Sequence, residues 1–280
     1  VLVSEVSSIS PASVVSASSV AQVQVAETTT APDIDMQSLS LKQIYRKMSA
    51  NFMKRKKRFS IACRYNSAVK KVVNGLNGKS NRGYYKILYE MATSADKSGN
   101  ADDGDYLYGN LGNMQCYYAD GRLDFYAVEY FETNAQTKKV NAFAARTAAK
   151  IRKKTSVRLE QIEYTYAYVI DHVRYDNRKN FNSSAYAGFV KRKTVCNGYA
   201  LMVYKILEKL GIRCRFISGS VSDGSRWYLH AWNKVRWKGK WYNLDACSDD
   251  EDDGEVYADY FMKSNKKFRK THRQDTFIRI

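Results

Sequence analysis

Three residues in the second half of the sequence carry side chains that together could perform acyl transfer. Cys196 opens the apolar segment VCNGYALMVYKIL (195–207), His230 lies in YLHAWNKVRW, and Asp245 lies in KWYNLDA. A thiol, an imidazole and a carboxylate in this order are typical of a nucleophile, its general base and the group that orients the base.

The sequence also predicts how the imidazole meets the carboxylate. Lys238-Gly239 separates two strand-like runs and suits a two-residue hairpin turn. In that hairpin Trp232 stands opposite Asp245. His230 shares a face with Trp232, so Asp245 becomes its diagonal neighbour at roughly 7–8 Å between backbones. A loop longer by one residue would turn Asp245 to the other face of the strand.

Cys196 is predicted to begin a helix that ends at Gly211. The apolar face of this helix is formed by Leu201, Tyr204, Ile206, Leu207 and Leu210. A thiol attacks as the thiolate, which is stabilised by a helix N-terminus and by an imidazolium, and Cys196 is expected to have both. Gly198 is expected to let the substrate or the histidine strand approach the first helical turn.

The motifs around these residues resemble a known family. VCNGYA, LGIRCRFISG (210–219) and HAWNKVRWKGKWYNLDA (230–246), with HVRYD and SAYAGFVKRKTVC upstream, are similar to the transglutaminase-like superfamily of cysteine enzymes from Tyr164 to Tyr260. The resemblance implies an α+β fold with a papain-like core. In that core a helix carries the cysteine, and an antiparallel sheet carries the histidine and the aspartate.

The resemblance also implies roles. Cys196 is the nucleophile, His230 the general base and acid, and Asp245 the residue that orients the histidine. The substrate is then a protein or peptide amide, either a glutamine carboxamide or a peptide bond, which forms a thioester with the enzyme. Water completes hydrolysis, and an amine co-substrate completes crosslinking. Many members have Thr-Trp shortly after the aspartate, whereas this chain has Ala246-Cys247-Ser248.

The oxyanion of such a reaction needs hydrogen-bond donors. The backbone N–H of Cys196 is expected to supply one. Candidates for the second donor, or for contact with the substrate, are Tyr175, Tyr186, Asn197 and Trp232. Simple packing is the alternative role for each tyrosine.

Three classes of function remain open at this stage. The first is a transglutaminase-like crosslinking acyltransferase, and the second is a cysteine peptidase or amidase that uses the same site. The third is a noncatalytic surface-binding module with a vestigial triad, against which the intact Cys, His and Asp argue. No cofactor is expected.

Cys247 is the rival nucleophile, because the extended register places it opposite His230, although on a strand without a helix dipole. Together with Cys63, Cys116 and Cys214 it is expected to be an unpaired small hydrophobe, since the spacing does not resemble a disulfide framework. Disulfide pairing in an oxidising compartment is the alternative.

No metal site is predicted, because the sequence has neither Cys-x-x-Cys nor His-x-x-x-His. His172 and His272 are expected at the surface or at helix ends. The acidic run SDDEDDGE (248–255) lacks the spacing of an EF-hand, so calcium binding is left open and a solvated loop near the site is expected.

Charge divides the chain unevenly. Residues 1–38 contain no Lys or Arg and hold both prolines, which predicts a disordered low-complexity linker. The remainder carries 46 basic residues against 28 − 4 = 24 acidic ones, a formal net charge of +22. Basic runs lie at 54–58 (KRKKR), 139–154 and 266–273.

Such a field favours anionic partners, namely cell-wall polymers, membrane surfaces, nucleic acid or acidic proteins, and wall or surface association is expected ahead of nucleic-acid binding. The sequence shows no helix-turn-helix, zinc-finger or RNA-recognition signature, so no specific nucleic acid is expected. The chain begins without methionine, as it would after signal-peptide removal, with trimming of the sequence as the alternative explanation. Its tyrosine and lysine content is similar to that of exported bacterial surface proteins. We therefore expect a secreted or cell-surface bacterial enzyme.

Three domains are predicted: the linker at 1–38, a basic, mainly helical subdomain with a β-hairpin at 39–155, and the catalytic domain at 156–280. Helices are predicted at 39–59, 67–76, 83–95, 139–153 and 156–173. A hairpin is predicted at 114–131 with its turn at Asp120-Gly121, and strands at 213–218, 228–237 and 240–246.

Overall fold

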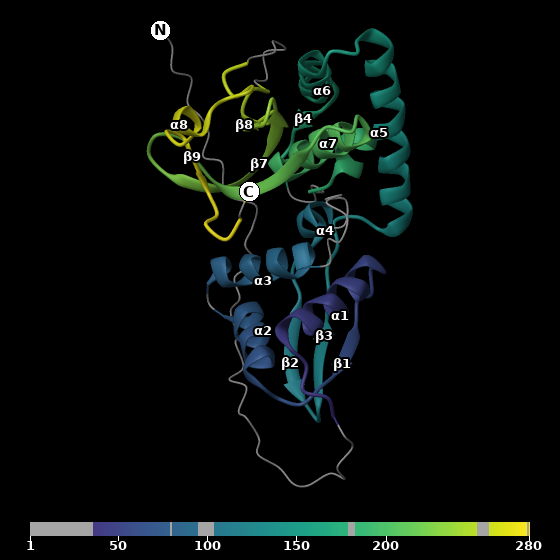
Figure 1. The fold of residues 1–280 in the computed structure, drawn as a ribbon, viewed down its shortest axis with the longest axis vertical. Helices are drawn as coiled ribbons and strands as arrows, with labels where there is room; N and C mark the ends of the chain where they lie inside the picture. The colour runs from purple at the N-terminus through teal and green to yellow at the C-terminus, as the bar shows by residue number, and fades with distance from the viewer. Residues whose placement is uncertain (1–35, 79, 95–103, 179–182, 251–257, 279) are drawn as a thin grey trace.

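The computed structural model describes residues 36–280 except 79, 95–103, 179–182, 251–257 and 279. The predicted linker at 1–38 therefore lies almost entirely outside the described residues. The described chain is α+β, as predicted, with its strands in antiparallel sheets apart from one short parallel pair. Figure 1 shows two lobes that meet near α4.

The lower lobe in Figure 1 is a three-stranded antiparallel sheet, in the order β1-β3-β2, that packs against helices. Phe59, Ile61, Leu123 and Phe125 alternate along their strands and are buried. The elements of this lobe are α1 (Leu41–Met53), β1 (Phe59–Ala62), α2 (Ser67–Asn77), α3 (Asn81–Ser94), α4 (Asp105–Asn110), β2 (Gln115–Ala119) and β3 (Arg122–Tyr126).

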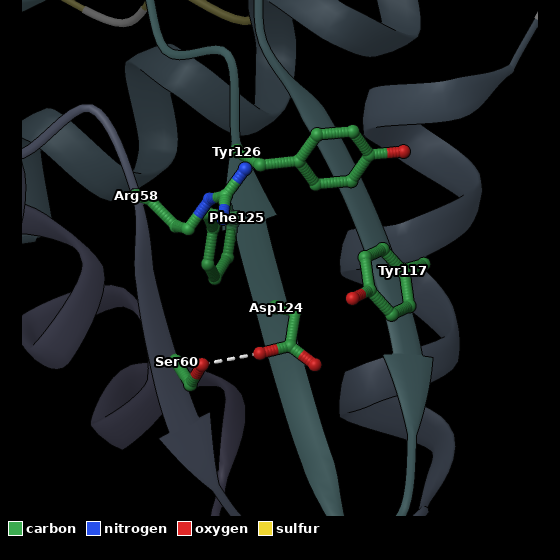
Figure 2. A pocket seen from close by; sticks show the side chains of 6 residues that line it. All are labelled: Arg58, Ser60, Tyr117, Asp124, Phe125 and Tyr126. Carbon is green, nitrogen blue, oxygen red and sulfur yellow. Dashed lines mark hydrogen bonds between the residues drawn. The ribbon is translucent and has the colours of Figure 1, made fainter.

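The outer face of this sheet presents aromatic rings beside charged groups (Figure 2). The rings of Tyr117 and Tyr126 meet edge to face, with centroids 5.3 Å apart. Next to them the Ser60 hydroxyl donates a hydrogen bond to Asp124. These residues, with Arg58 and Phe125, line a shallow hollow of about 390 Å³.

The helix predicted at 39–59 is wrong at its C-terminal end. α1 begins after a capping box formed by Ser40 and Gln43 and ends at Met53. Arg55 then has a φ of 55°, a left-handed conformation that stops the helix. The strand β1 follows, and its alternation of buried and exposed residues is the signal that the prediction missed.

The upper lobe is a four-stranded antiparallel sheet, in the order β8-β7-β6-β9, packed with helices. Its elements are α5 (Asn134–Lys154), α6 (Arg158–His172), β4 (Arg174–Tyr175), the π-helix η1 (Ala187–Lys191), β5 (Lys193–Thr194), α7 (Cys196–Lys209), β6 (Cys214–Ser222), β7 (Trp227–Trp237), β8 (Lys240–Leu244), α8 (Asn265–Phe268) and β9 (His272–Gln274).

The other predicted elements are present, with shifted ends. The hairpin turn at Asp120-Gly121 is confirmed, because β2 and β3 pair across it and both residues have positive φ. The short α4 and the strand β9 were not predicted.

α7 lies at the centre of the upper lobe, between α5 and α6 on one side and β6 and β7 on the other. Asn233 in β7 donates from Nδ2 to the carbonyl of Ala200 in α7 at 3.0 Å. Asp105 in α4 accepts hydrogen bonds from Arg215 at 2.6 and 2.9 Å, which joins the lobes. One continuous hydrophobic core extends through both lobes, and the subdivision at 38 and 155 stays a prediction.

Candidate active site

The first turn of α7 positions the thiol. The helix begins at Cys196 after the N-cap residue Val195, which offers no side-chain cap, and its first turn contains no acidic residue. The first N–H groups of a helix have no partner within it and carry its partial positive charge. The half-exposed Cys196 thiol thus lies where a helix stabilises a thiolate.

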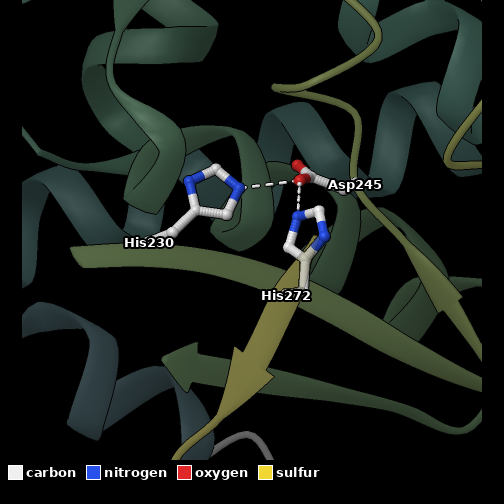
Figure 3. Close-up of side chains that lie close together, drawn as sticks. All are labelled: His230, Asp245 and His272. Carbon is white, nitrogen blue, oxygen red and sulfur yellow. Dashed lines mark hydrogen bonds and ion pairs between the residues drawn. The ribbon is translucent and has the colours of Figure 1, made fainter. Parts of the chain in front are cut away.

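The β7–β8 hairpin positions the imidazole and the carboxylate. Lys238 and Gly239 both have positive φ, at 45° and 77°, as a two-residue turn requires. Trp237 pairs with Lys240, so the predicted register is confirmed. His230 Nε2 then lies 2.7 Å from Asp245 Oδ2 (Figure 3).

His230 is held as a cation when a thiolate is beside it. Burial lowers the pKa of the imidazole, but the charges of Asp245 and Cys196 and hydrogen bonds to both raise it to about 10. Because Nε2–H donates to the carboxylate, the neutral ring leaves Nδ1 free to accept a proton. The imidazole can therefore exchange a proton with the thiol.

Asp245 is 1% exposed and is surrounded by donors. Its Oδ1 accepts the backbone N–H groups of Cys247 and Ser248, both at 3.2 Å. The Ser248 hydroxyl donates to Oδ2 at 2.6 Å. Burial alone would raise the pKa of Asp245, but His230 and His272 hold this pKa well below its usual range. The carboxylate is thus ionised and fixed in place.

His272 is buried on a strand, so the prediction made for it is wrong. It was expected at the surface or at a helix end, but it is 1% exposed and lies on β9. Its Nε2 is 2.9 Å from the same Asp245 oxygen that accepts from His230 (Figure 3). His172 does end a helix, α6, as expected. The basic run around His272 gave no sign of burial.

Two of the four oxyanion or substrate candidates have their donors occupied. Trp232 is 1% exposed, and its indole N–H donates to Asn243 Oδ1 at 3.2 Å. The Asn197 amide donates to the carbonyls of Gly109 and Ser183, at 2.9 and 2.7 Å. Both side chains therefore support the site, because their N–H groups are directed into the protein.

The two tyrosine candidates differ in position. Tyr175 is 36% exposed, and the pKa of its phenol is raised by burial of the hydroxyl and by the neighbouring Cys196 and Cys247. The Tyr175 phenol thus interacts electrostatically with the Cys196 thiol. Tyr186 packs against the core, and its backbone N–H donates to Glu132 Oε1 at 2.8 Å. Tyr175 therefore remains the better placed of the four candidates.

The five cysteines are unpaired, and three of them, Cys63, Cys116 and Cys214, are buried. Cys247 lies in a turn rather than on an extended strand opposite His230, because β8 ends at Leu244. Burial, followed by the nearby charges of Cys196 and Asp245, raises the pKa of the Cys247 thiol well above its usual value. The thiolate is disfavoured at Cys247.

His230, Asp245 and His272 bring three potential metal ligands together, with donor atoms within 4.8 Å of one another. Tetrahedral zinc ligands at 2.0–2.1 Å from the metal would be about 3.3 Å apart. The separations of 2.7 and 2.9 Å are shorter and are those of hydrogen bonds. The three groups therefore fit a proton-bearing network.

The acidic run at 248–255 is only partly described. A solvated loop was expected, but the described part is buried at Asp249, which is 1% exposed. Asp249 accepts hydrogen bonds from the Tyr166 hydroxyl and from the Tyr260 backbone N–H. Asp250 accepts from the Tyr199 hydroxyl. These carboxylates anchor the turn after Asp245 to the helices α6 and α7.

Gly198 was expected to let the substrate or the histidine strand approach the first turn of α7, but the space beside it is filled by Thr194 and Ser184. A Cβ at this position would lie 2.1 Å from Thr194 Oγ1 and 2.8 Å from the Ser184 carbonyl. The glycine thus lets the chain before α7 pack closely on its first turn.

A Gly198→Ala variant is expected to lower the free energy of unfolding by about 1–3 kcal/mol, the usual cost of overpacking. Urea denaturation measures this change. Gly83→Ala in α3 is the matched control, because its Cβ meets only the Gly75 carbonyl at 3.6 Å and the Ser80 Cβ at 4.0 Å. Alanine is the better helix former by about 1 kcal/mol, so this control should not destabilise the protein. Equal stabilities for the two variants would contradict the close approach at Gly198.

Iodoacetamide at pH 6 is expected to label Cys196 much faster than any other cysteine. The His230 cation persists up to about pH 10 and stabilises the thiolate beside it. Burial raises the pKa of Cys63, Cys116 and Cys214, so these thiols stay protonated. Peptide mapping after short exposure identifies the labelled residue, and first labelling of Cys247 would count against the assignment.

Comparison with known proteins supports a transglutaminase-like core. Residues 145–246 match the family model of the transglutaminase-like superfamily. The matched segment is similar to that superfamily, and it contains Cys196, His230 and Asp245. No curated protein matches the chain.

Three solved structures are similar to part of this chain. The crystal structure of a TGase is 16% identical, with a TM-score of 0.37, over 57% of this chain and 50% of that one. A candidate cysteine protease from Cytophaga hutchinsonii is 16% identical, with a TM-score of 0.33, over 48% and 61%. The periplasmic domain of TgpA from Pseudomonas aeruginosa, bound to ethylmercury, is 14% identical, with a TM-score of 0.29, over 45% and 54%. The chain thus spans 50–61% of the length of these proteins.

Proposed function

We propose that this protein is a thiol acyltransferase that acts on protein or peptide amides, with Cys196 as nucleophile, His230 as general base and acid, and Asp245 as the orienting carboxylate. The proposal depends on one observation above all. A cysteine at a helix N-terminus without a side-chain cap is hydrogen-bonded to an imidazole whose Nε2 is held by a buried carboxylate at 2.7 Å. This is the arrangement that cysteine acyl transfer requires.

In the first half of the reaction, the Cys196 sulfur attacks the amide carbon and the C=O electron pair moves to oxygen. The backbone N–H of Cys196 is the proposed first donor to that oxyanion, and the Tyr175 hydroxyl is the proposed second. The C–N bond then breaks as His230 transfers its proton to the leaving nitrogen. Ammonia leaves from a glutamine carboxamide, an amine leaves from a peptide bond, and a thioester remains on Cys196.

In the second half, His230 accepts a proton from the incoming nucleophile, which attacks the thioester carbon. Water gives the acid and completes hydrolysis, whereas a lysine or another amine gives a new amide and completes a crosslink. Cys196 leaves as a thiolate, and the imidazolium is restored beside it.

The test is to incubate the protein with a glutamine peptide, with and without a labelled amine. We expect ammonia release together with incorporation of the amine. Ammonia without incorporation would make the protein an amidase, and backbone cleavage would make it a peptidase. A protein that alkylates normally at Cys196 but yields none of these products would be a binding module, and the proposal would be wrong.

We further propose that the enzyme works outside the cell on an anionic wall polymer or membrane surface. The basic run at 54–58 supports this proposal, since Lys54, Lys56, Lys57 and Arg58 are exposed. Arg58 also lines the aromatic hollow on the sheet of the lower lobe (Figure 2). None of the helices in the described ranges has the length and apolar character needed to cross a membrane.

Replacing these four exposed residues by glutamine is expected to weaken binding to acidic-lipid vesicles or wall polymer by about 1 kcal/mol per charge. Arg55 is kept, because its Nε donates to the Glu132 carbonyl at 3.0 Å and the residue is structural. Wild-type binding should also weaken steeply with salt, since exposed charges are screened within about 10 Å at 0.1 M. Cosedimentation measures both effects.

The matched control neutralises four exposed basic residues of α5, Lys138, Lys139, Lys150 and Lys153, which changes the net charge equally. This control should lose less binding than the cluster variant. Turnover of a small soluble peptide should be the same in both. Equal losses would mean that net charge, and not this surface, attracts the partner.

A further inference from the structure

We propose that His272 is a positioning residue for the acyl-transfer reaction, a second histidine that holds the carboxylate on which His230 depends. This inference rests on the proposed roles of Cys196, His230 and Asp245. His272 lies beyond residue 246, where the match to the superfamily model ends. Figure 3 shows the two imidazoles approaching one carboxylate oxygen from two different strands.

The hydrogen bonds of His272 define its tautomer. Its Nε2 lies 2.9 Å from Asp245 Oδ2, and an ionised carboxylate only accepts, so Nε2 carries a proton. The Thr271 hydroxyl lies 2.8 Å from Nδ1 and donates to it when the ring is neutral. His272 thus donates from Nε2 to the carboxylate, and both ring nitrogens have hydrogen-bond partners.

Aromatic neighbours keep the His272 ring from turning. Phe268 stacks on it with centroids 3.8 Å apart. Trp232 and Tyr260 meet it edge-on at 5.3 and 5.2 Å. The side chain is 0% exposed, so water cannot take the place of Asp245 as its partner.

The strand β9 is itself fixed by the sheet. It pairs with β6 from Gly219↔Gln274 to Val221↔His272. A Cβ at Gly219 would lie 2.2 Å from the Arg273 carbonyl, so only glycine allows this approach. The Gln274 side chain accepts from Lys234 Nζ at 2.6 Å, and Asp275 accepts from the Ser218 hydroxyl at 2.5 Å. His272 is therefore placed by two layers of contacts rather than by a free C-terminal tail.

The chemical consequence concerns Asp245 Oδ2, which accepts from His230, His272 and Ser248. His230 changes charge in each catalytic cycle, whereas His272 does not take part in proton transfer with the thiol. A constant donor keeps the carboxylate ionised and aimed at His230 throughout the cycle, as outer hydrogen-bond partners do for ligating histidines. His272 thus acts on the thiol only through Asp245 and His230.

The test compares His272→Leu with His272→Gln, whose Nε2 can still donate toward Asp245. The readout is the rate of Cys196 alkylation by iodoacetamide from pH 5 to 9, with circular dichroism to verify folding. We expect the leucine variant to react about 10- to 100-fold more slowly at pH 6, the range found when outer hydrogen-bond partners are removed. The glutamine variant should recover most of the rate.

The pH profile must be read against the other titratable groups near the carboxylate. These are His230 on β7, Tyr166 on α6, Cys247 and Asp249 in the turn after β8, and Tyr260 before α8. All of them are retained in both variants, so the difference between the two profiles reports on the imidazole at position 272.

Two results would overturn the inference: a folded leucine variant that alkylates like the wild type, or a folded glutamine variant as slow as the leucine one. If neither variant folds, Thr271→Val removes only the hydroxyl that sets the tautomer, and an unchanged rate in that variant would count against the inference. Alkylation needs no amide substrate. If the protein turned over no amide, the proposed function would be wrong, but the alkylation rates would still test the role of His272.

Discussion

A Cys196→Ala variant is expected to release neither ammonia nor amine from a glutamine peptide above the background rate. The thioester cannot form without the sulfur, and loss of a nucleophile in a comparable triad costs about 10⁶-fold in turnover. The fold should survive, because Cys196 is half-exposed at the start of α7 and the core begins with the residues that follow it. Initial rates of ammonia release, with thermal unfolding as the check on stability, measure the effect.

Cys247→Ala is the matched control, since Cys247 is a second thiol near Cys196, whose charge helps to raise the pKa of Cys247. The backbone N–H of this residue donates to Asp245, and alanine retains it. We therefore expect turnover close to that of the wild type. Loss of activity in this control, with activity retained in Cys196→Ala, would move the nucleophile to Cys247.

The pairing of His230 with Asp245 could be predicted because it is local. A two-residue turn at Lys238-Gly239 allows only one register between the two strands. The alternation of side chains then determines which residues share a face. The helix that begins at Cys196 follows in the same way from apolar periodicity and from Gly211, whose φ is 72°. These inferences need fewer than about 20 neighbouring residues, which is the range over which patterns are informative.

His272 could not be predicted because its burial depends on a distant strand. β9 has three residues, lies in a basic run, and is strand-like only when it pairs with β6 about fifty residues earlier in the chain. The sequence also gives the type of a polar group but not its partner. Asn197 and Trp232 have donors suited to an oxyanion, and only the fold shows that Gly109, Ser183 and Asn243 accept them.

The orientation of His230 leads to the second large effect. An Asp245→Asn variant is expected to lower turnover by about 10⁴-fold, as the same change does in a Ser-His-Asp triad. In the wild type, His230, His272 and Ser248 donate to Oδ2, and two backbone N–H groups donate to Oδ1. Asparagine has only one acceptor oxygen, so it cannot accept from both sets of donors. If the amide N–H₂ faces His230, the imidazole must carry its proton on Nδ1 and cannot accept one from the thiol.

The change should also alter the pH dependence. Burial lowers the pKa of His230, but interactions with Asp245 and Cys196 raise it to about 10, and the charge of Asp245 is the largest of these interactions. Without that charge the His230 cation is lost at a lower pH. Alkylation of Cys196 in the variant should therefore be slower at pH 6 and should rise toward higher pH as the thiol ionises unaided. Asp259→Asn, at an exposed position, is the control for loss of one negative charge and should match the wild type. Equal turnover in the Asp245→Asn and Asp259→Asn proteins, both folded, would reduce Asp245 to a residue that shapes the turn after β8.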